Sequence, residues 1–378
     1  MTAPSVGDFH PNDPLTRQAL ADLTFQLGLV LASSAPAGSE PAPESAAGGG
    51  ATSRRTASDQ PPSDPTTTST TPTEAPPTEA PPTEAPPTEP VTTTAAPTEA
   101  PPPAPPPTVA KPDAPVSLAG LDARLVSSLG LSGAAAEFAA GAKAAGLTVP
   151  SRFGTEVVAR LLGLRTNHPA ALDGLELLPN DPATRAEAAY SAAQILGFGW
   201  LGNSWQTAAV QSLADSFALP ELNSWQRQIL TVAFSKIGMP YIWGGTSDGP
   251  EAPFGVASRG GYDCSGFVWR VYKLQSYPGE RGLASTLRGR TTYEMSVEVP
   301  PSQRIPFAKL EPADVIFFGD RGPRSTSAEI GHMAIYVGNG WFIQSSDEGV
   351  ALAQLSGWYR QRFAWARRPL QEAGLTTG

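Results

Sequence analysis

The sequence predicts an α+β domain at the C-terminal end of the chain, at about residues 224–370, after a mostly α-helical segment and a disordered Pro/Thr-rich linker. Two observations predict the mixed domain. Apolar residues recur at helical spacing after Ser224, which we expect to be the N-cap of that helix, and again after Cys264. Short apolar runs bounded by turn residues, at 310–320 and 331–346, are typical of strands. Helices and strands that follow one another in this way favour an α+β fold.

The rest of the chain divides by composition. A length of 378 residues is typical of two or three domains, and twenty of the 41 prolines lie between Pro61 and Pro115. That segment, in which TEAPP recurs in tandem, cannot bury enough apolar surface to offset its ordering entropy. We expect an extended spacer of about 3 Å per residue, with a composition also typical of O-glycosylated stalks. The predicted regions are a partial repeat at 1–32, the linker at 33–115, a helical region at 116–223, the α+β domain at 224–370 and a tail at 371–378.

A seven-residue pattern, PNDPxTR, occurs at 11–17 and again at 179–185, and each copy precedes a helical pattern. An Asn-Asp-Pro sequence forms a turn, and the Asp or Thr side chain can accept hydrogen bonds from the first amides of a helix. The simplest interpretation is a generic turn before a helix. The pattern also resembles the end of an S-layer homology repeat, at about 8–32 and 116–198. That resemblance implies repeats that assemble in threes and hold a protein to secondary cell-wall polymers.

Composition also excludes several classes of protein. A net charge of −9 argues against nucleic-acid binding, and a single cysteine rules out an intramolecular disulfide. The three histidines are too scattered for a Cys/His metal site, and no apolar run approaches the roughly 18 residues of a membrane span. The N-terminus lacks the features of a signal peptide. Because the first repeat lacks its first half, we expect the chain to begin inside a longer protein that is secreted and located in the cell wall.

The lone cysteine, Cys264, stands where a helical pattern begins. Apolar residues follow it at helical spacing, and Gly260 and Gly261 leave space beside it. The positive end of a helix dipole favours a thiolate over a thiol. A structural cysteine would more often lie within the apolar stripe of the helix. This position therefore indicates a reactive thiol.

A histidine with a polar neighbour is predicted on a hairpin further along the chain. Strands at 333–337 and 341–345 flank a Gly-Asn-Gly turn, and His332 stands at the start of the first strand. Gln344, on the second strand, is placed to lie across from His332; Asp347 or Glu348 could orient the imidazole instead. A nucleophile at a helix start, a base on a strand and a polar orienting residue match the arrangement of thiol proteases.

Four blocks of residues follow one another in this part of the chain: PYIWGG (240–245), DCSGF (263–267), LEPADVIFF (310–318) and GHMAIYVGNGWFIQSS (331–346). In their order and with fitting gaps they resemble the NlpC-type cell-wall endopeptidases over about 145 residues. The resemblance implies a papain-like fold and hydrolysis of peptidoglycan stem peptides, commonly at the bond between D-glutamate and the diamino acid. It implies no metal and no organic cofactor.

Carried over to this sequence, the resemblance implies Cys264 as nucleophile, His332 as base and Gln344 in the orienting position. Substrate-binding residues would be Tyr241, which lines the acyl site, and the pair Asp263 and Ser265, which contact the peptide amine of the substrate.

This sequence departs from the family pattern at two positions. The family most often has histidine at the position of Gln344, although a glutamine carbonyl can also accept a hydrogen bond from the imidazole. Ala313 replaces the usual glycine of a Pro-Gly-Asp turn, a change we expect to be harmless.

Two alternatives to the peptidase remain open at this point. One is a non-catalytic protein that binds the cell wall, and the other is an amidase or acyltransferase on the same fold. A rapidly alkylated thiol would argue against the first, and the identity of the bond that is lost would decide the second.

Overall fold

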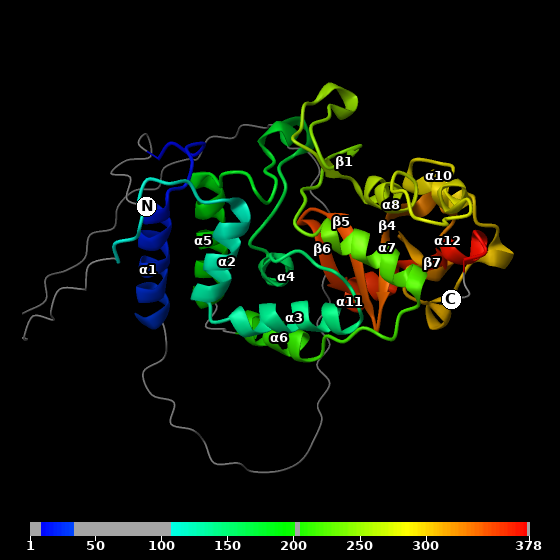
Figure 1. The fold of residues 1–378 in the computed structure, drawn as a ribbon, viewed down its shortest axis with the longest axis horizontal. Coiled ribbons are helices and arrows are strands. Elements are labelled where there is room, and N and C mark those ends of the chain that lie inside the picture. Colours follow the sequence, from blue (N-terminus) through cyan, green and yellow to red (C-terminus); the bar gives the residue numbers. More distant parts are fainter. Residues whose placement is uncertain (1–8, 34–106, 201–204, 376–378) are drawn as a thin grey trace, which may run out of the picture. The chain divides into compact units, whose positions relative to one another are not determined.

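Helices make up the first part of the described chain, and a five-stranded antiparallel sheet with flanking helices makes up the second (Figure 1). The computed structural model describes residues 9–33, 107–200 and 205–375, and most of the predicted linker lies outside them. The helices are α1 (Arg17–Ser33), α2 (Leu118–Ser128), α3 (Ser132–Ala144), α4 (Phe153–Leu161), α5 (Arg185–Trp200), α6 (Trp205–Asp215), α7 (Ser224–Ser235), α8 (Cys264–Tyr272), α9 (Leu283–Thr286), α10 (Thr292–Val297), α11 (Gly357–Arg362) and α12 (Pro369–Glu372). The strands are β1 (Thr246–Ser247), β2 (Gly261–Tyr262), β3 (Val315–Gly319), β4 (Ile330–Gly338), β5 (Trp341–Ser346), β6 (Gly349–Gln354) and β7 (Phe363–Arg367).

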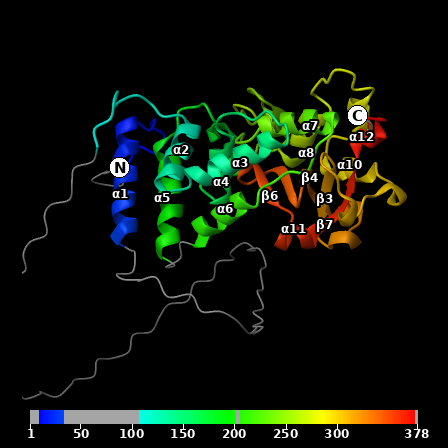
Figure 2. The ribbon, with the colours of Figure 1, turned by 60° about the horizontal axis from the view of Figure 1, so that its bottom comes forward.

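Three turns, each followed by a helix, close a ring of backbone hydrogen bonds. The amide of Leu15 donates to the carbonyl of Ala183 (2.7 Å), Ala183 donates to Val116 (2.8 Å), and Val116 donates to Leu15 (2.9 Å). The helices that follow, α1, α2 and α5, lie side by side in both views (Figures 1 and 2). Residues 112–118 (PDAPVSL) therefore occupy a third position equivalent to the two PNDPxTR copies.

The first amides of these three helices are capped by side chains at equivalent positions, at 3.2 Å in each case. Thr16 accepts from Ala19, and Thr184 accepts from Glu187, as the sequence pattern predicts. Ser117 caps α2 in the same way by accepting from Gly120. The last residues of the predicted linker, 107–115, are folded against the start of α1, where Gln18 donates to the carbonyl of Pro112 (3.1 Å).

No single helix among the described residues is long and apolar enough to cross a membrane. Helices α2 and α3 together have a sufficient length and apolar composition, but the chain bends by 118° between them.

The five-stranded sheet has the order β6-β5-β4-β3-β7 with every neighbouring pair antiparallel. Side chains of the sheet alternate between two cores, as the period of two requires. Phe317 and Ile335 face the main core with α7 and α8, whereas Phe318 and Phe342 face a smaller core that Tyr359 of α11 helps to cover. Figure 2 shows α7 and α8 on one side of the sheet and α11 on the other.

The helical region and the sheet share one apolar core. Phe138 of α3 packs against Phe217 (ring centroids 5.0 Å apart) and against Trp341 of β5 (5.8 Å), and Phe217 also meets Trp341 edge to face (5.3 Å). In a second contact between the two parts, Phe153 of α4 stacks on Phe234 of α7, with ring centroids 5.0 Å apart. Helices α3 and α4 are therefore packed against the α+β domain through buried aromatic contacts.

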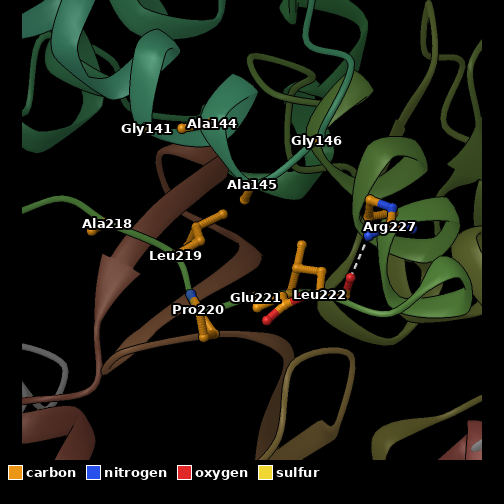
Figure 3. Close-up of a pocket in the computed structure, with 10 residues that line it drawn as sticks. All are labelled: Gly141, Ala144, Ala145, Gly146, Ala218, Leu219, Pro220, Glu221, Leu222 and Arg227. Carbon is orange, nitrogen blue, oxygen red and sulfur yellow. Dashed lines mark hydrogen bonds between the residues drawn. The ribbon is translucent and has the colours of Figure 1, made fainter.

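The connector between α6 and α7 borders an open pocket of ≈ 470 Å³, at the C-terminal end of α3 (Figure 3). Leu219 and Leu222 of the connector and Arg227 of α7 are among its lining residues, and the Arg227 guanidinium donates to the carbonyl of Leu222. Neither Cys264 nor a residue next to it lines this pocket, so it is separate from the cleft described below.

Several predicted elements are confirmed, with two local corrections. The helix after Cys264 and the hairpin around Asn339 form as expected. Ser224 was expected to cap α7, but the N-cap is Asn223, because Asn223 and Gln226 form a reciprocal capping box. Ala313 adopts a left-handed backbone with a φ of +70°, so the alanine in place of glycine is strained rather than harmless.

Candidate active site

Cys264 is the first residue of α8, as the sequence predicts, and is 9% exposed. The Asp263 side chain caps the helix by accepting from the Gly266 amide. Gly266 permits the close approach of the Gly245 carbonyl, which would lie 1.9 Å from a Cβ at this position. The glycine therefore allows the start of α8 to lie directly against the Gly-rich loop that precedes it.

The surroundings of Cys264 favour its thiolate. Burial raises the pKa of the thiol, but hydrogen bonding to the His332 imidazole and its positive charge outweigh burial, so that the pKa of Cys264 is lowered overall. The Thr292 hydroxyl lies 3.4 Å from the sulfur and acts in the same direction. Burial lowers the pKa of His332, yet the interaction with Cys264 raises it overall. The two shifts together favour a thiolate–imidazolium pair.

His332 is oriented by Gln344. The Nε2 of His332 lies 2.7 Å from Gln344 Oε1, and the Gln344 amide group donates to the hydroxyl of Tyr359 at 2.7 Å. The imidazole also stacks on Phe318, with centroids 5.6 Å apart and an interplanar angle of 27°. Among the three orienting residues considered from the sequence, Gln344 is the one that bonds the ring. Asp347 acts on His332 through charge alone.

A cleft of ≈ 370 Å³ opens above Cys264. All three predicted substrate-binding residues line it, and burial together with the nearby Cys264 raises the pKa of Tyr241. The cleft also has aromatic side chains that remain largely exposed: Trp243 at 57%, Phe254 at 80% and Tyr293 at 54%. The lining residues are Tyr241, Trp243, Gly244, Phe254, Asp263, Cys264, Ser265, Arg290, Thr291, Thr292, Tyr293 and Gly331.

Arg290 is a cleft residue that the sequence analysis did not identify. Its guanidinium donates to both carboxylate oxygens of Asp263 (3.2 Å each) and to the Ser265 hydroxyl (2.7 Å). It also donates to the carbonyls of Gly244 (3.0 Å) and Gly245 (3.3 Å). A Thr-x-x-Glu capping box directly after Arg290 could have indicated a helix start there, but not its contact with a residue 27 positions earlier.

A cysteine on a helix start, a histidine on an adjacent strand and an amide that orients the histidine define the class of papain-like cysteine peptidases. Residues 238–368 match the model of the NlpC/P60 family, and the C-terminal part of the chain is a domain of that family.

Named relatives share this part of the chain. Murein DD-endopeptidase MepH of Escherichia coli (strain K12) is 32% identical over 166 residues, which are 43% of this chain and 52% of that protein. Probable peptidoglycan endopeptidase LytE of Bacillus subtilis (strain 168) is 29% identical over 37% of this chain and 34% of its own length. The chain therefore spans about half, or less, of these curated relatives. A solved NlpC/P60 family protein from Bacillus cereus aligns at 26% identity over 40% of this chain and 42% of the other, with a TM-score of 0.30.

Proposed function

We propose that this protein is a peptidoglycan endopeptidase that cleaves stem peptides of the bacterial cell wall with Cys264 as nucleophile. The observation that carries the proposal is the pairing of a buried helix-start cysteine, at the floor of an open cleft, with a histidine held by Gln344. The relatives named endopeptidases support the same activity. The non-catalytic alternative gains no support from this pairing, because a wall-binding surface needs no activated thiol.

In the proposed mechanism, His332 takes the proton of the Cys264 thiol and the thiolate attacks the carbonyl carbon of the scissile amide. Because Gln344 bonds Nε2, the Nδ1 nitrogen is the one available to the cysteine. The tetrahedral oxyanion is stabilised by the Cys264 N–H, one of the amides that a helix start leaves without an intrahelical acceptor, and by the Tyr241 hydroxyl. Each such donor is worth about 3–4 kcal/mol.

The imidazolium then gives its proton to the leaving amine as the carbon–nitrogen bond breaks and the thioester forms. Water, deprotonated by His332, hydrolyses the thioester and restores the thiol. The proposed bond is the one between D-glutamate and the diamino acid. Asp263 and Ser265 face the cleft from the start of α8, and their proposed role is to bind the amine of the substrate peptide with Arg290 holding them in place.

The helical region has a separate proposed role in binding secondary cell-wall polymers, as S-layer homology repeats do. The ring of hydrogen bonds among three equivalent turns supports this proposal, since such repeats assemble in threes. Sedimentation of the protein with purified wall, before and after removal of the secondary polymers, tests it. Equal sedimentation with both preparations would contradict the role.

The peptidase proposal is tested by digestion of purified peptidoglycan with the wild-type chain and with Cys264→Ala. Mass spectrometry of the products identifies the bond that is lost and so separates an endopeptidase from an amidase or acyltransferase. We expect new stem-peptide fragments from the wild type and none from the variant, at equal folded content by circular dichroism. Fragments released by Cys264→Ala would contradict the assignment.

A further inference from the structure

The loop of residues 241–244, which lines the cleft, is held from two sides. On the side of the catalytic helix, the Gly244 amide donates to Asp263 (3.0 Å) and the Gly244 carbonyl accepts from Arg290 (3.0 Å). On the other side, the loop contacts residues 167–173 of the helical region, a segment between α4 and α5. These second contacts come from outside residues 238–368 and therefore from outside the NlpC/P60 domain.

Asn167 connects two parts of the active site. Its side-chain amide donates to the carbonyl of Tyr241 at 2.7 Å, and its backbone amide donates to the carbonyl of Asp347, also at 2.7 Å. Tyr241 lines the cleft beside Cys264, and Asp347 follows the strand that carries Gln344. One residue of the helical region thus fixes the backbone of both segments.

Asp173 makes the second contact, from the short 3-10 helix η2 (Ala170–Leu175). It is 3% exposed, and its carboxylate accepts from the backbone amide of Trp243 at 3.2 Å. The Trp243 side chain nevertheless remains 57% exposed at the cleft. Asp173 therefore fixes the backbone of Trp243 while its indole ring stays available to a ligand.

The contacting segment is itself braced. His168 Nδ1 lies 2.9 Å from the carboxylate of Glu176, the residue that follows η2, so this interaction links the start of the segment to the end of η2. Buried Arg160 of α4 donates to the carbonyl of Gly238 (3.0 Å), which precedes the cleft loop in the chain. A braced segment can hold the loop in one position, whereas a loose segment would move with it.

We infer that residues 167–173 of the helical region position the cleft loop for substrate, and that Asn167 and Asp173 are positioning residues for Tyr241 and Trp243. The inference rests on the proposed peptidase function. It gives the helical region a part in substrate binding, in addition to any part in wall attachment. Neither residue touches the Cys264–His332 pair. Substitutions at Asn167 or Asp173 should therefore loosen the loop and leave the reactivity of the Cys264 thiol unchanged.

Kinetics on the full chain with stem-peptide substrate provide the first test. We expect Asn167→Ala and Asp173→Ala to raise KM and lower kcat/KM by about three- to tenfold each, the effect of one lost hydrogen bond. Asp173→Asn should retain most activity, because its carbonyl still accepts from Trp243. Asn339→Gly is the matched control, since it removes a similar bond to the Ala218 carbonyl (2.9 Å). The alkylation rate of Cys264 should be unchanged in all four variants.

Hydrogen exchange provides a second test that does not depend on activity. Asp173→Ala should speed exchange of the Trp243 amide, while the amides of α8 keep their protection. If the loop keeps wild-type protection and KM equals that of the control, or if alkylation of Cys264 slows together with turnover, the inference is wrong. A wild-type chain without peptidase activity would contradict the proposed function instead, and exchange would still decide the contact between helical region and loop.

Discussion

Gln344 connects His332, the proposed catalytic base, to the small core on one face of the sheet. Its carbonyl oxygen lies 2.7 Å from His332 Nε2, and its amide group donates to Tyr359, whose ring packs against Phe342 at 4.9 Å. Gln344 is 2% exposed, so it exchanges few of these bonds with water. Burial makes the glutamine a fixed acceptor, and the imidazole that it holds is fixed with it.

We expect Gln344→Ala to lower kcat/KM by about 10- to 150-fold, because a hydrogen bond to a charged imidazolium is worth about 1.5–3 kcal/mol. Gln344→His should retain substantial activity, since an imidazole nitrogen can accept the same bond. Steady-state kinetics on stem peptides measure both effects. Tyr359→Phe is the control that keeps the bond to His332 and loses only the outer one, and its loss should be smaller. Wild-type rates in Gln344→Ala would show that another group orients the ring.

The opposite pKa shifts of Cys264 and His332 predict a bell-shaped dependence of kcat/KM on pH. The lowered pKa of Cys264 places the acid limb below the ordinary titration of a thiol, and the raised pKa of His332 places the alkaline limb above that of a free imidazole. Alkylation by iodoacetamide reports the thiolate directly. His332→Ala should move the alkylation midpoint to higher pH, because the largest contribution that lowers the pKa of the thiol is then lost while burial still raises it. An unmoved midpoint would mean that the helix start, not the histidine, ionises Cys264.

Arg290→Lys should weaken both substrate binding and folding, because an ammonium cannot make the planar set of bonds that Arg290 makes to Asp263, Ser265 and the Gly244 carbonyl. We expect a loss of about 1–3 kcal/mol in the free energy of unfolding and a raised KM. Urea denaturation and steady-state kinetics measure these two effects. Arg288→Lys, at a neighbouring exposed position, is the matched control and should change neither. Equal behaviour of the two variants would exclude a role for Arg290 in the cleft.

The residues predicted correctly from the sequence are those with local signals. Cys264 precedes an apolar helical stripe, and Asn339 lies in a Gly-Asn-Gly turn between two strand patterns; the fold places both as expected. The hairpin then brings Gln344 to His332. The N-cap of α7 was misplaced by one residue because Asn223 and Ser224 are both good caps, and only the partner Gln226 distinguishes them.

The residues that the sequence did not reveal depend on contacts between distant segments. Arg290 reaches Asp263 across 27 positions, and Asn167 reaches Tyr241 across 74. The third turn, at 112–118, lacks the Thr-Arg of the other two copies, and only the closed ring of hydrogen bonds identifies it. Hydrophobic periodicity and residue propensities describe neighbours along the chain, so they do not predict contacts between distant segments.

The turn before β3 offers a prediction about stability. Ala313 has a φ of +70°, its amide donates to the carbonyl of Tyr336 (2.8 Å), and its own carbonyl accepts from the Tyr272 hydroxyl. A left-handed alanine costs about 1–2 kcal/mol relative to glycine, whereas glycine loses about 0.4–1 kcal/mol more entropy on folding. Ala313→Gly should therefore raise the free energy of unfolding by about 0.5–1 kcal/mol, with unchanged kcat/KM.

A matched variant separates this effect from the general cost of glycine. Ala136 is exposed within α3, where its backbone is helical, so Ala136→Gly should destabilise the protein by about 1 kcal/mol. The same substitution thus has opposite signs at the two sites, and urea denaturation of both variants under one set of conditions measures the difference. If Ala313→Gly destabilises the protein as Ala136→Gly does, the turn at Ala313 stores no strain, and its alanine is as well accommodated as the glycine it replaces.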